Sequence, residues 1–228
     1  AAAMRSKGLP GIYVNASEII KTDKNYLSGK VDFKKTDKNI VSFFVTINGI
    51  GVVTGFIASD EDGNITTLGR GGSDYTVSIL GAALKADMIE IWTDVDGIYS
   101  ADPSIVSAAF IIPQLSLDEA IELSYFGAKV LHPSSFIPLT EKKIPLVIKN
   151  TLSPTSPGTL ISNIDHNNDK KKKLAKSITA IDHVTLLIWR GHGEIEVSST
   201  IERLFKSLSQ ASVNILLILE GSPKHTIC

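Results

Sequence analysis

The chain is organised around the sequence Thr66-Thr67-Leu68-Gly69-Arg70-Gly71-Gly72-Ser73-Asp74-Tyr75-Thr76, which contains the first candidate site. An apolar run typical of a strand, 52–57, precedes it, and the apolar spacing after it predicts a helix over residues 74–86. Three glycines in four residues let the backbone approach a bound molecule closely, and free N–H groups at a helix start favour an anion. Arg70 adds a planar guanidinium suited to a carboxylate or phosphate, and Ser73 and Asp74 are common helix-capping types. The segment therefore predicts a binding site for a small anion, with an ordinary glycine-rich turn as the alternative.

The order of the predicted elements indicates an α/β protein with a mostly parallel, open sheet flanked by helices. Residues 88–92 predict the next strand, so strand, glycine turn, helix and strand follow one another as in a βαβ unit. Residues 21–39 are polar and predict a surface loop, whereas 40–47 fits either a helix or a strand. The other predicted elements are a strand at 11–14, a capped helical turn at 15–20, a helix at 115–131 capped by Ser116, a short helix between Pro138 and Pro145, and strands at 146–150 and 159–161.

A polar stretch divides the chain into two predicted domains. Residues 163–176 contain a run of four lysines, 170–173, which we interpret as part of a solvated linker rather than as a binding patch. Residues 1–162 form the first predicted domain and 177–228 a second, partial one with the order β-α-β-β. Its predicted elements are a strand at 184–189, a helix at 198–209, a strand at 213–219 and the start of a strand at 224–228.

The composition excludes several classes of protein. A charged content of 21%, a hydrophobic content of 43% and a net charge of −1 predict a globular protein without affinity for nucleic acid. Cys228 is the single cysteine, so the chain has no internal disulfide and no cysteine metal site. The five histidines lack metal-ligand spacing, and no apolar run has membrane-spanning length. We therefore expect no bound metal of its own, no membrane contact and a cytoplasmic location.

A second candidate site follows the strand at 88–92, in the segment Thr93-Asp94-Val95-Asp96-Gly97-Ile98-Tyr99. The carboxyl ends of parallel strands are where α/β sheets bind ligands. Asp94 is suited to a ribose or to phosphate-held Mg²⁺, and Tyr99 to packing on a base. The alternative is a simple turn at Asp96-Gly97. Lys129, where a helix begins or resumes, is a point charge suited to phosphate, although most helix lysines are only solvated.

Three segments together resemble a known family. Thr93 to Pro103 resembles the nucleotide segment of the amino-acid kinase family, whose glutamate 5-kinases and uridylate kinases carry similar versions. Thr67 to Thr76 and Phe126-Gly127-Ala128-Lys129-Val130-Leu131-His132-Pro133 resemble the more specific aspartokinase signatures. The segment from Ser177 to Asp182 onward resembles the first ACT regulatory module that follows an aspartokinase domain, an incomplete ferredoxin-like α+β domain here.

This resemblance implies ATP-dependent phosphorylation of the side-chain carboxylate of L-aspartate, the first step of lysine, threonine and methionine biosynthesis. By the same resemblance, Arg70 and Ser73 hold aspartate and Asp74 organises the reacting groups. The residues that it assigns to ATP, with Mg²⁺ carried by the nucleotide, are Thr93, Asp94, Tyr99, Lys129 and Val130. It also implies a homo-oligomer formed through ACT modules and feedback control by lysine or threonine, with Glu194 and Asn214 as the candidate effector contacts.

Two departures from the family pattern affect these expectations. Several relatives have an arginine near the phosphates where this chain has Ser104. Aspartokinases also begin with Lys-Phe-Gly-Gly-Thr-Ser, whose lysine meets the transferred phosphoryl group, and this motif does not occur here. We therefore expect the N-terminal part of the kinase domain to be missing and the 228-residue chain alone to have no aspartokinase activity. A non-catalytic regulatory subunit of the same family and another amino-acid kinase are the alternative functions.

Overall fold

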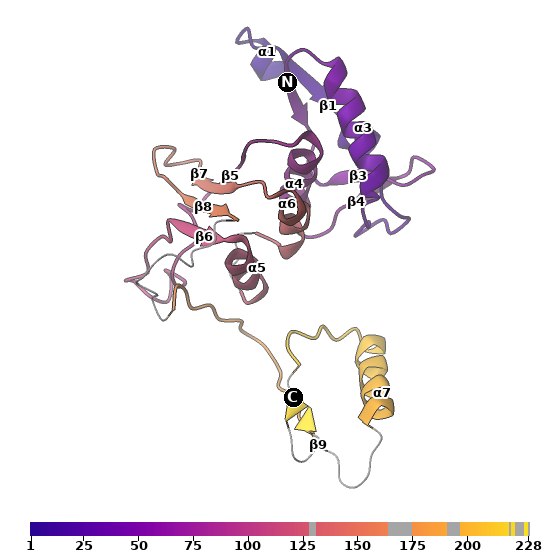
Figure 1. Cartoon of the computed structure of the whole chain (residues 1–228), viewed down its shortest axis with the longest axis vertical. Coiled ribbons are helices and arrows are strands. Elements are labelled where there is room, and N and C mark those ends of the chain that lie inside the picture. Colours follow the sequence, from indigo (N-terminus) through magenta and orange to yellow (C-terminus); the bar gives the residue numbers. More distant parts are fainter. Residues whose placement is uncertain (128–130, 164–174, 191–196, 219, 222–225, 228) are drawn as a thin grey trace. The chain divides into compact units, whose positions relative to one another are not determined.

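The computed structural model describes residues 1–127, 131–163, 175–190, 197–218, 220–221 and 226–227. The chain divides into two compact units, Ala1–Ala180 and Ile181–Cys228. Figure 1 shows the elements, which are α1 Ala2–Arg5, β1 Gly11–Val14, α2 Ala16–Ile19, α3 Phe33–Thr46, β2 Ile50–Val53, β3 Ile57–Ser59, β4 Ile65–Thr67, α4 Gly72–Leu84, β5 Ile89–Thr93, β6 Gln114–Ser116, α5 Leu117–Tyr125, the 3-10 helix η1 Pro133–Phe136, α6 Ile137–Lys142, β7 Leu146–Asn150, β8 Thr159–Ser162, β9 Trp189–Arg190, α7 Val197–Gln210, β10 Glu220–Gly221 and β11 Thr226–Ile227.

The main sheet of the first unit has the strand order β5-β7-β8-β6. The pairs β5–β7 and β6–β8 are parallel, and β7–β8 is antiparallel. β7 is central and almost wholly buried, which its continuous apolar sequence Leu146-Val147-Ile148 requires, whereas the edge strand β5 alternates buried and exposed residues. The helices α4, α5 and α6 lie next to this sheet, which confirms the predicted α/β class (Figure 1).

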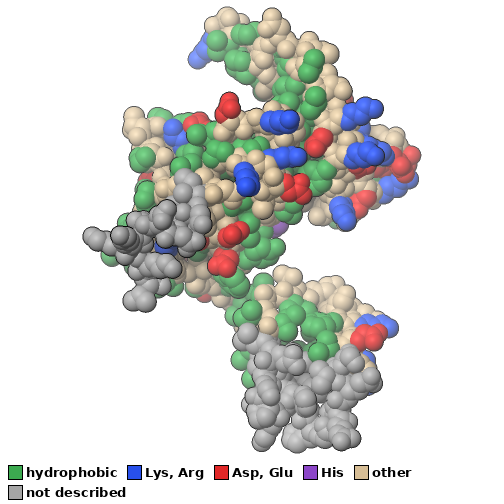
Figure 2. Space-filling view, in the orientation of Figure 1, with side chains coloured by type: hydrophobic (Ala, Val, Ile, Leu, Met, Phe, Trp, Pro, Cys, Tyr) green, Lys and Arg blue, Asp and Glu red, His purple; other side chains and the backbone are tan. Residues whose placement is uncertain are grey.

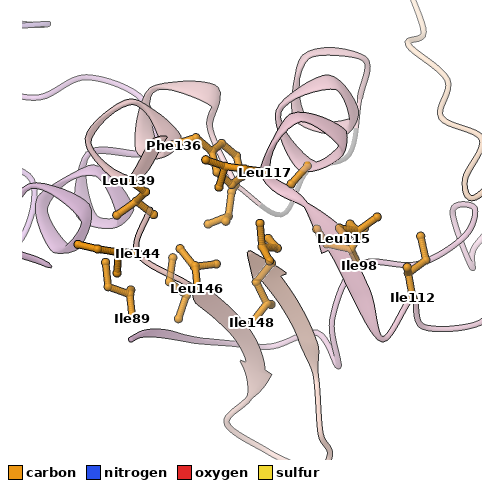
Figure 3. Close-up of a cluster of buried hydrophobic side chains, with 14 of the residues drawn as sticks. Ile89, Ile98, Ile112, Leu115, Leu117, Phe136, Leu139, Ile144, Leu146 and Ile148 are labelled. Carbon is orange, nitrogen blue, oxygen red and sulfur yellow. The ribbon is translucent and has the colours of Figure 1, made fainter. Parts of the chain in front are cut away.

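Two hydrophobic clusters stabilise the first unit, and α4 contributes to both. Ala82 of α4 belongs to the cluster under the main sheet, and Ile79 belongs to the cluster formed with β1, α2, α3 and β3. Figure 3 shows the first cluster, to which Leu146 and Ile148 of β7 and Phe136 of η1 belong. Because α4 is buried on two sides, the position of its N-terminus is fixed from both clusters.

Two expectations for the N-terminal half are wrong. Residues 33–39, expected to be part of a surface loop, form the first half of α3. The run 40–47, which fitted either a helix or a strand, is helical over 40–46. Asp32 caps this helix through its bond from the Lys35 N–H at 3.0 Å, and Thr36 and Ile40 are buried while the lysines face solvent. The run 52–57 is not one strand, because β2 ends at Val53 and β3 begins at Ile57. The strand that enters the glycine turn is therefore β4, paired antiparallel with β3.

The helix predicted over 115–131 is shorter, because 114–116 is strand β6 and α5 ends at Tyr125. Ser116 does cap α5, as predicted, and Glu119 completes a capping box. The strands predicted at 11–14, 146–150 and 159–161 and the helix between the two prolines are confirmed.

The second unit keeps the predicted order of strand, helix, strand and strand as β9, α7, β10 and β11. The strands predicted at 184–189 and 213–219 are wrong over 184–188 and 213–218, which have no regular structure. Their apolar side chains, such as Leu186 and Leu217, are exposed, and among the described residues no neighbouring strand pairs with their backbone. A strand needs such a partner to satisfy its N–H and C=O groups, so apolar sequence alone does not make one.

The surface of the first unit carries both signs of charge. Lys24 pairs with Asp62 at 2.9 Å, and Lys35 lies 3.6 Å from Asp32. Figure 2 shows blue and red side chains mixed over the face it presents, as the net charge of −1 suggests. None of the helices in the described parts of the chain has the length and apolar character that crossing a membrane requires.

Candidate functional site

The glycine turn connects β4 to α4 and depends on two left-handed glycines. Gly69 has φ +73° and Gly71 has φ +69°. A Cβ on Gly71 would lie 2.4 Å from the Cβ of His132, and one on Gly69 would lie 2.8 Å from the hydroxyl of Ser28. Both positions therefore require glycine for conformation and for space.

The helix start differs from the expectation. α4 begins at Gly72 and its N-cap is Gly71, so Ser73 and Asp74 lie in the first turn rather than capping it. No side chain caps α4 in the part of the chain that the structure describes, so N–H groups of the first turn remain available to a ligand. The predicted anion site at this helix start is consistent with this geometry.

The three polar side chains of the turn have few partners. Arg70 and Ser73 are exposed, and no hydrogen bond or ion pair of the Arg70 guanidinium occurs among the described residues. Asp74 is half-buried, and burial raises the pKa of its carboxyl although a helix N-terminus favours a negative charge. A carboxylate whose charged form is disfavoured by burial, as at Asp74, is a feature found at functional sites.

Phe56, which lies against the same turn, was not among the site residues predicted from the sequence. Its backbone has φ +76°, a conformation that costs free energy in a non-glycine residue. Its N–H donates to the Thr76 hydroxyl at 3.0 Å, and that hydroxyl donates to the Gly72 carbonyl at 2.7 Å. Gly55 passes so close that a Cβ there would lie 3.3 Å from the Ser73 hydroxyl. The neighbouring Gly55 is the only local signal that could have suggested an unusual backbone at this point.

The second candidate segment leaves the end of β5, as predicted. Thr93 is the last residue of β5, and its hydroxyl donates to the exposed Asp94 carboxylate at 3.2 Å. The Tyr99 hydroxyl donates to Asp96 at 3.4 Å, and the pKa of Tyr99 is raised, first by burial and then by the charge of Asp96. Asp96 also accepts from Asn150 Nδ2 at 2.8 Å, a contact that sequence reasoning missed because the two residues lie 54 positions apart.

The fold brings the two candidate segments to the same edge. α4 and β5 run in opposite directions through a short connection, and a Cβ on Gly81 of α4 would touch Ile89 at the start of β5. From that contact, the helix rises about 13 Å to its N-terminus at ~1.5 Å per residue. The strand covers about 13 Å to Thr93 at ~3.3 Å per residue. The glycine turn and the segment from Thr93 to Tyr99 thus end at one edge of the unit.

The remaining predicted site residues are only partly described. Lys129 and Val130 lie outside the described residues, but His132 at the end of the same motif contacts Gly71. In the second unit Asn214 is exposed, and Glu194 lies outside the described residues. Within the described parts of the chain, no group of three or more His, Cys, Asp or Glu side chains is placed to hold a metal ion.

Comparisons with known proteins agree with this architecture. Residues 1–150 match the amino acid kinase family. The chain is 38% identical over 225 residues to a bifunctional aspartokinase/homoserine dehydrogenase of Buchnera aphidicola, a match that spans 98% of this chain and 27% of that protein. A chloroplastic bifunctional aspartokinase/homoserine dehydrogenase of Arabidopsis thaliana is 36% identical over 234 residues, across 100% of this chain and 26% of its own length.

A solved structure is also similar. The crystal structure of E. coli aspartokinase III in complex with aspartate and ADP has a TM-score of 0.81 and 28% identity, over 98% of this chain and 49% of that one. The chain therefore spans about a quarter of the length of the curated relatives it matches and about half of this solved chain. The match over residues 1–150, together with the shared fold, shows that the chain belongs to the amino acid kinase family.

Proposed function

We propose that the protein to which this chain belongs phosphorylates the side-chain carboxylate of L-aspartate with ATP, giving aspartyl phosphate. The observation that carries the proposal is the glycine turn, in which Arg70, exposed and without a described partner, directly precedes an uncapped helix start whose first turn contains the half-buried Asp74. Guanidinium and backbone N–H groups are the donors that hold a carboxylate substrate. The aspartokinase names of the similar proteins support the choice of aspartate over other amino acids.

We assign aspartate to Arg70 and Ser73, with Asp74 organising the reacting groups. ATP is assigned to Thr93, Asp94 and Tyr99, together with Lys129 and Val130. The solved relative was crystallised with aspartate and ADP, which supports a two-ligand site. Mg²⁺ would arrive on the nucleotide phosphates, because the described residues offer no cluster that could bind it alone and Mg²⁺ commonly keeps several waters. Phosphoryl transfer then depends mainly on positioning and on charge neutralisation.

Regulation is a separate part of the proposal. We infer that residues 177–228 begin an ACT module after a linker at 163–176 and a kinase part at 1–162, although the first compact unit extends to Ala180. A second crystal structure of E. coli aspartokinase III contains lysine, which supports lysine as an effector, with threonine as the alternative. Glu194 and Asn214 are the proposed effector contacts, and assembly through ACT modules and a cytoplasmic location remain predictions.

Calorimetric titration of the chain with MgADP and with L-aspartate tests the two assignments separately. Arg70→Ala should weaken aspartate binding roughly ten- to a hundredfold, because hydrogen bonds to charged groups contribute ~1.5–3 kcal/mol and ~1.4 kcal/mol is tenfold. MgADP binding should be unchanged, and Asp94→Ala should show the reverse pattern. Arg70→Lys should restore little, because an ammonium group lacks the planar arrangement of donors.

Stability measurements separate this role from a structural one. Arg70 is exposed and has no described partner, so Arg70→Ala should change the free energy of unfolding by no more than ~0.5 kcal/mol. Equal losses of aspartate and MgADP binding, accompanied by a lower melting temperature, would show that Arg70 supports the fold rather than the substrate. Tight glutamate binding in place of aspartate would favour another amino-acid kinase.

A further inference from the structure

Asn150, the last residue of β7, holds the segment after β5 from a neighbouring strand. The residue is 8% exposed, and both ends of its amide are bonded. Its Nδ2 donates to Oδ1 of Asp96 at 2.8 Å, and its Oδ1 accepts the Leu152 N–H at 2.8 Å. The bond from the Leu152 N–H holds the Asn150 amide in one orientation. The bond from Nδ2 of that amide therefore holds the Asp96 carboxylate in place.

Thr159, the first residue of β8, holds the same segment at Ile98, two residues after Asp96. It is fully buried, and its hydroxyl accepts the Ile98 N–H at 2.8 Å and donates to the Ile112 carbonyl at 2.7 Å. Gly97 has φ +148°, and a Cβ there would lie 2.5 Å from that hydroxyl. Glycine at 97 is therefore what allows the segment to approach Thr159 closely enough to bond.

These two anchors act on residues that lie between those expected to meet a nucleotide, with Thr93 and Asp94 before them and Tyr99 after them. Asp96 and Ile98 are fixed by Asn150 and Thr159, and the second carboxylate oxygen of Asp96 accepts the Tyr99 hydroxyl at 3.4 Å. The backbone on the other side is also tied to β7, because the Thr151 N–H donates to the Thr93 carbonyl at 2.8 Å. A change at Asn150 would thus reach Tyr99 through Asp96 without touching a ligand.

We propose that Asn150 and Thr159 are positioning residues of the nucleotide segment, which hold Thr93, Asp94 and Tyr99 in the arrangement that binds the nucleotide. This inference rests on the nucleotide site proposed above. It adds two residues from β7 and β8 that belong to no binding motif and that act through Asp96 and Ile98.

Asn150→Asp is the decisive variant, because it keeps the shape of the side chain but removes its Nδ2 donor. It also places a second carboxylate next to that of Asp96. MgADP affinity, measured by calorimetry at pH 8, should fall at least fivefold. The loss of MgADP affinity is measured relative to the unmodified chain at each pH, and it should become smaller toward pH 5. At that pH one of the two adjacent carboxyl groups takes a proton and can donate a hydrogen bond in place of the amide. The double variant Asp96→Asn/Asn150→Asp restores the pair in reverse and should bind within about twofold of the unmodified chain.

Thr159→Val tests the second anchor and leaves the Ile98 N–H without its acceptor. Hydrogen exchange of residues 94–112, measured without nucleotide, should speed up in both Thr159→Val and Asn150→Asp. Thr36→Val is the matched control, because buried Thr36 likewise bridges a backbone N–H and carbonyl, those of Lys21, far from the segment in sequence. Asn163→Asp, at an exposed position, controls for the added charge. Both controls should leave MgADP affinity and the exchange of 94–112 unchanged.

The outcomes are distinguishable. Failure of the unmodified chain to bind MgADP would overturn the proposed nucleotide site itself. If that chain binds but Asn150→Asp and Thr159→Val bind equally well, or if the reversed pair rescues nothing, the positioning role is wrong.

Discussion

The replacement Gly71→Ala tests whether the glycine turn is built as the structure shows. An alanine at φ +69° pays about 1–2 kcal/mol for the left-handed conformation. Its Cβ would also stand 2.4 Å from the Cβ of His132, well inside the ~3.5–4.0 Å of an ordinary carbon contact. His132 immediately precedes η1, so relieving this contact requires a backbone shift, and such overpacking costs about 1–3 kcal/mol. The sum predicts a loss of roughly 2–5 kcal/mol in the free energy of unfolding.

Gly63→Ala is the matched control for the backbone term. Gly63 has φ +86°, but nothing lies within 4 Å of a Cβ placed there. This variant should therefore lose only about 1–2 kcal/mol. The difference between the two variants isolates the contact with His132, and His132→Gly in the Gly71→Ala background should recover part of it as a coupling of ~0.5–3 kcal/mol.

Urea unfolding followed by tryptophan fluorescence measures these values. The chain has two tryptophans, one in each unit, so a Trp189→Phe background leaves Trp92 to report on the first unit alone. At about 2–4 °C per kcal/mol, Gly71→Ala should also lower the melting temperature by roughly 4–20 °C. Equal losses for Gly71→Ala and Gly63→Ala, or no coupling to His132, would refute the packing of the turn against η1.

Three further changes follow from single interactions. Asp74→Asn should raise the free energy of unfolding at pH 7 but not at pH 3. Burial raises the pKa of the Asp74 carboxyl, so the unmodified chain loses stability as pH rises from the ordinary aspartate pKa through the raised one. A loss at pH 7 would contradict this. Burial acts to raise the pKa of Glu119, but hydrogen bonds from Lys176, at 2.6 Å, and from Ser116 outweigh it and lower that pKa. Glu119→Gln should therefore destabilise the chain above the ordinary glutamate pKa, an effect that disappears as pH falls through the lowered value, and a pH-independent loss would show that charge is not involved. Ser116→Ala should cost ~1 kcal/mol in urea unfolding at pH 7, because α5 loses its cap, and an unchanged midpoint would contradict that.

The sequence alone was sufficient where the determining interactions are local. The cap of α5 by Ser116 joins residues three positions apart, and the strand β7 follows from an uninterrupted apolar run. The glycine turn was likewise predictable, because positive φ at Gly69 and Gly71 is a property of the residue type. The family resemblance added the assignment of ligands, which composition and spacing did not provide.

Tertiary packing decided the elements whose local sequence is ambiguous. Residues 33–39 are polar enough for a loop, yet they are helical because Thr36 and Ile40 are buried next to α2 and α4. The run 52–57 is apolar enough for one strand, yet it breaks after Thr54, whose N–H still donates to Val14 of β1, because the Phe56 N–H donates to the Thr76 hydroxyl of α4 instead of to a strand. Residues 184–188 show the converse, since apolar sequence without a partner strand stays irregular.

The candidate nucleotide segment combines both kinds of information. One short stretch of sequence contains Thr93, Asp94 and Tyr99, and their position at the end of β5 follows from the apolar strand sequence before them. Its shape is set by Asn150 and Thr159, which bond to it from 54 and 61 positions away. Sequence determines local conformation through neighbouring side chains and backbone torsions, whereas hydrogen bonds between distant residues exist only once β5, β7 and β8 have assembled into one sheet.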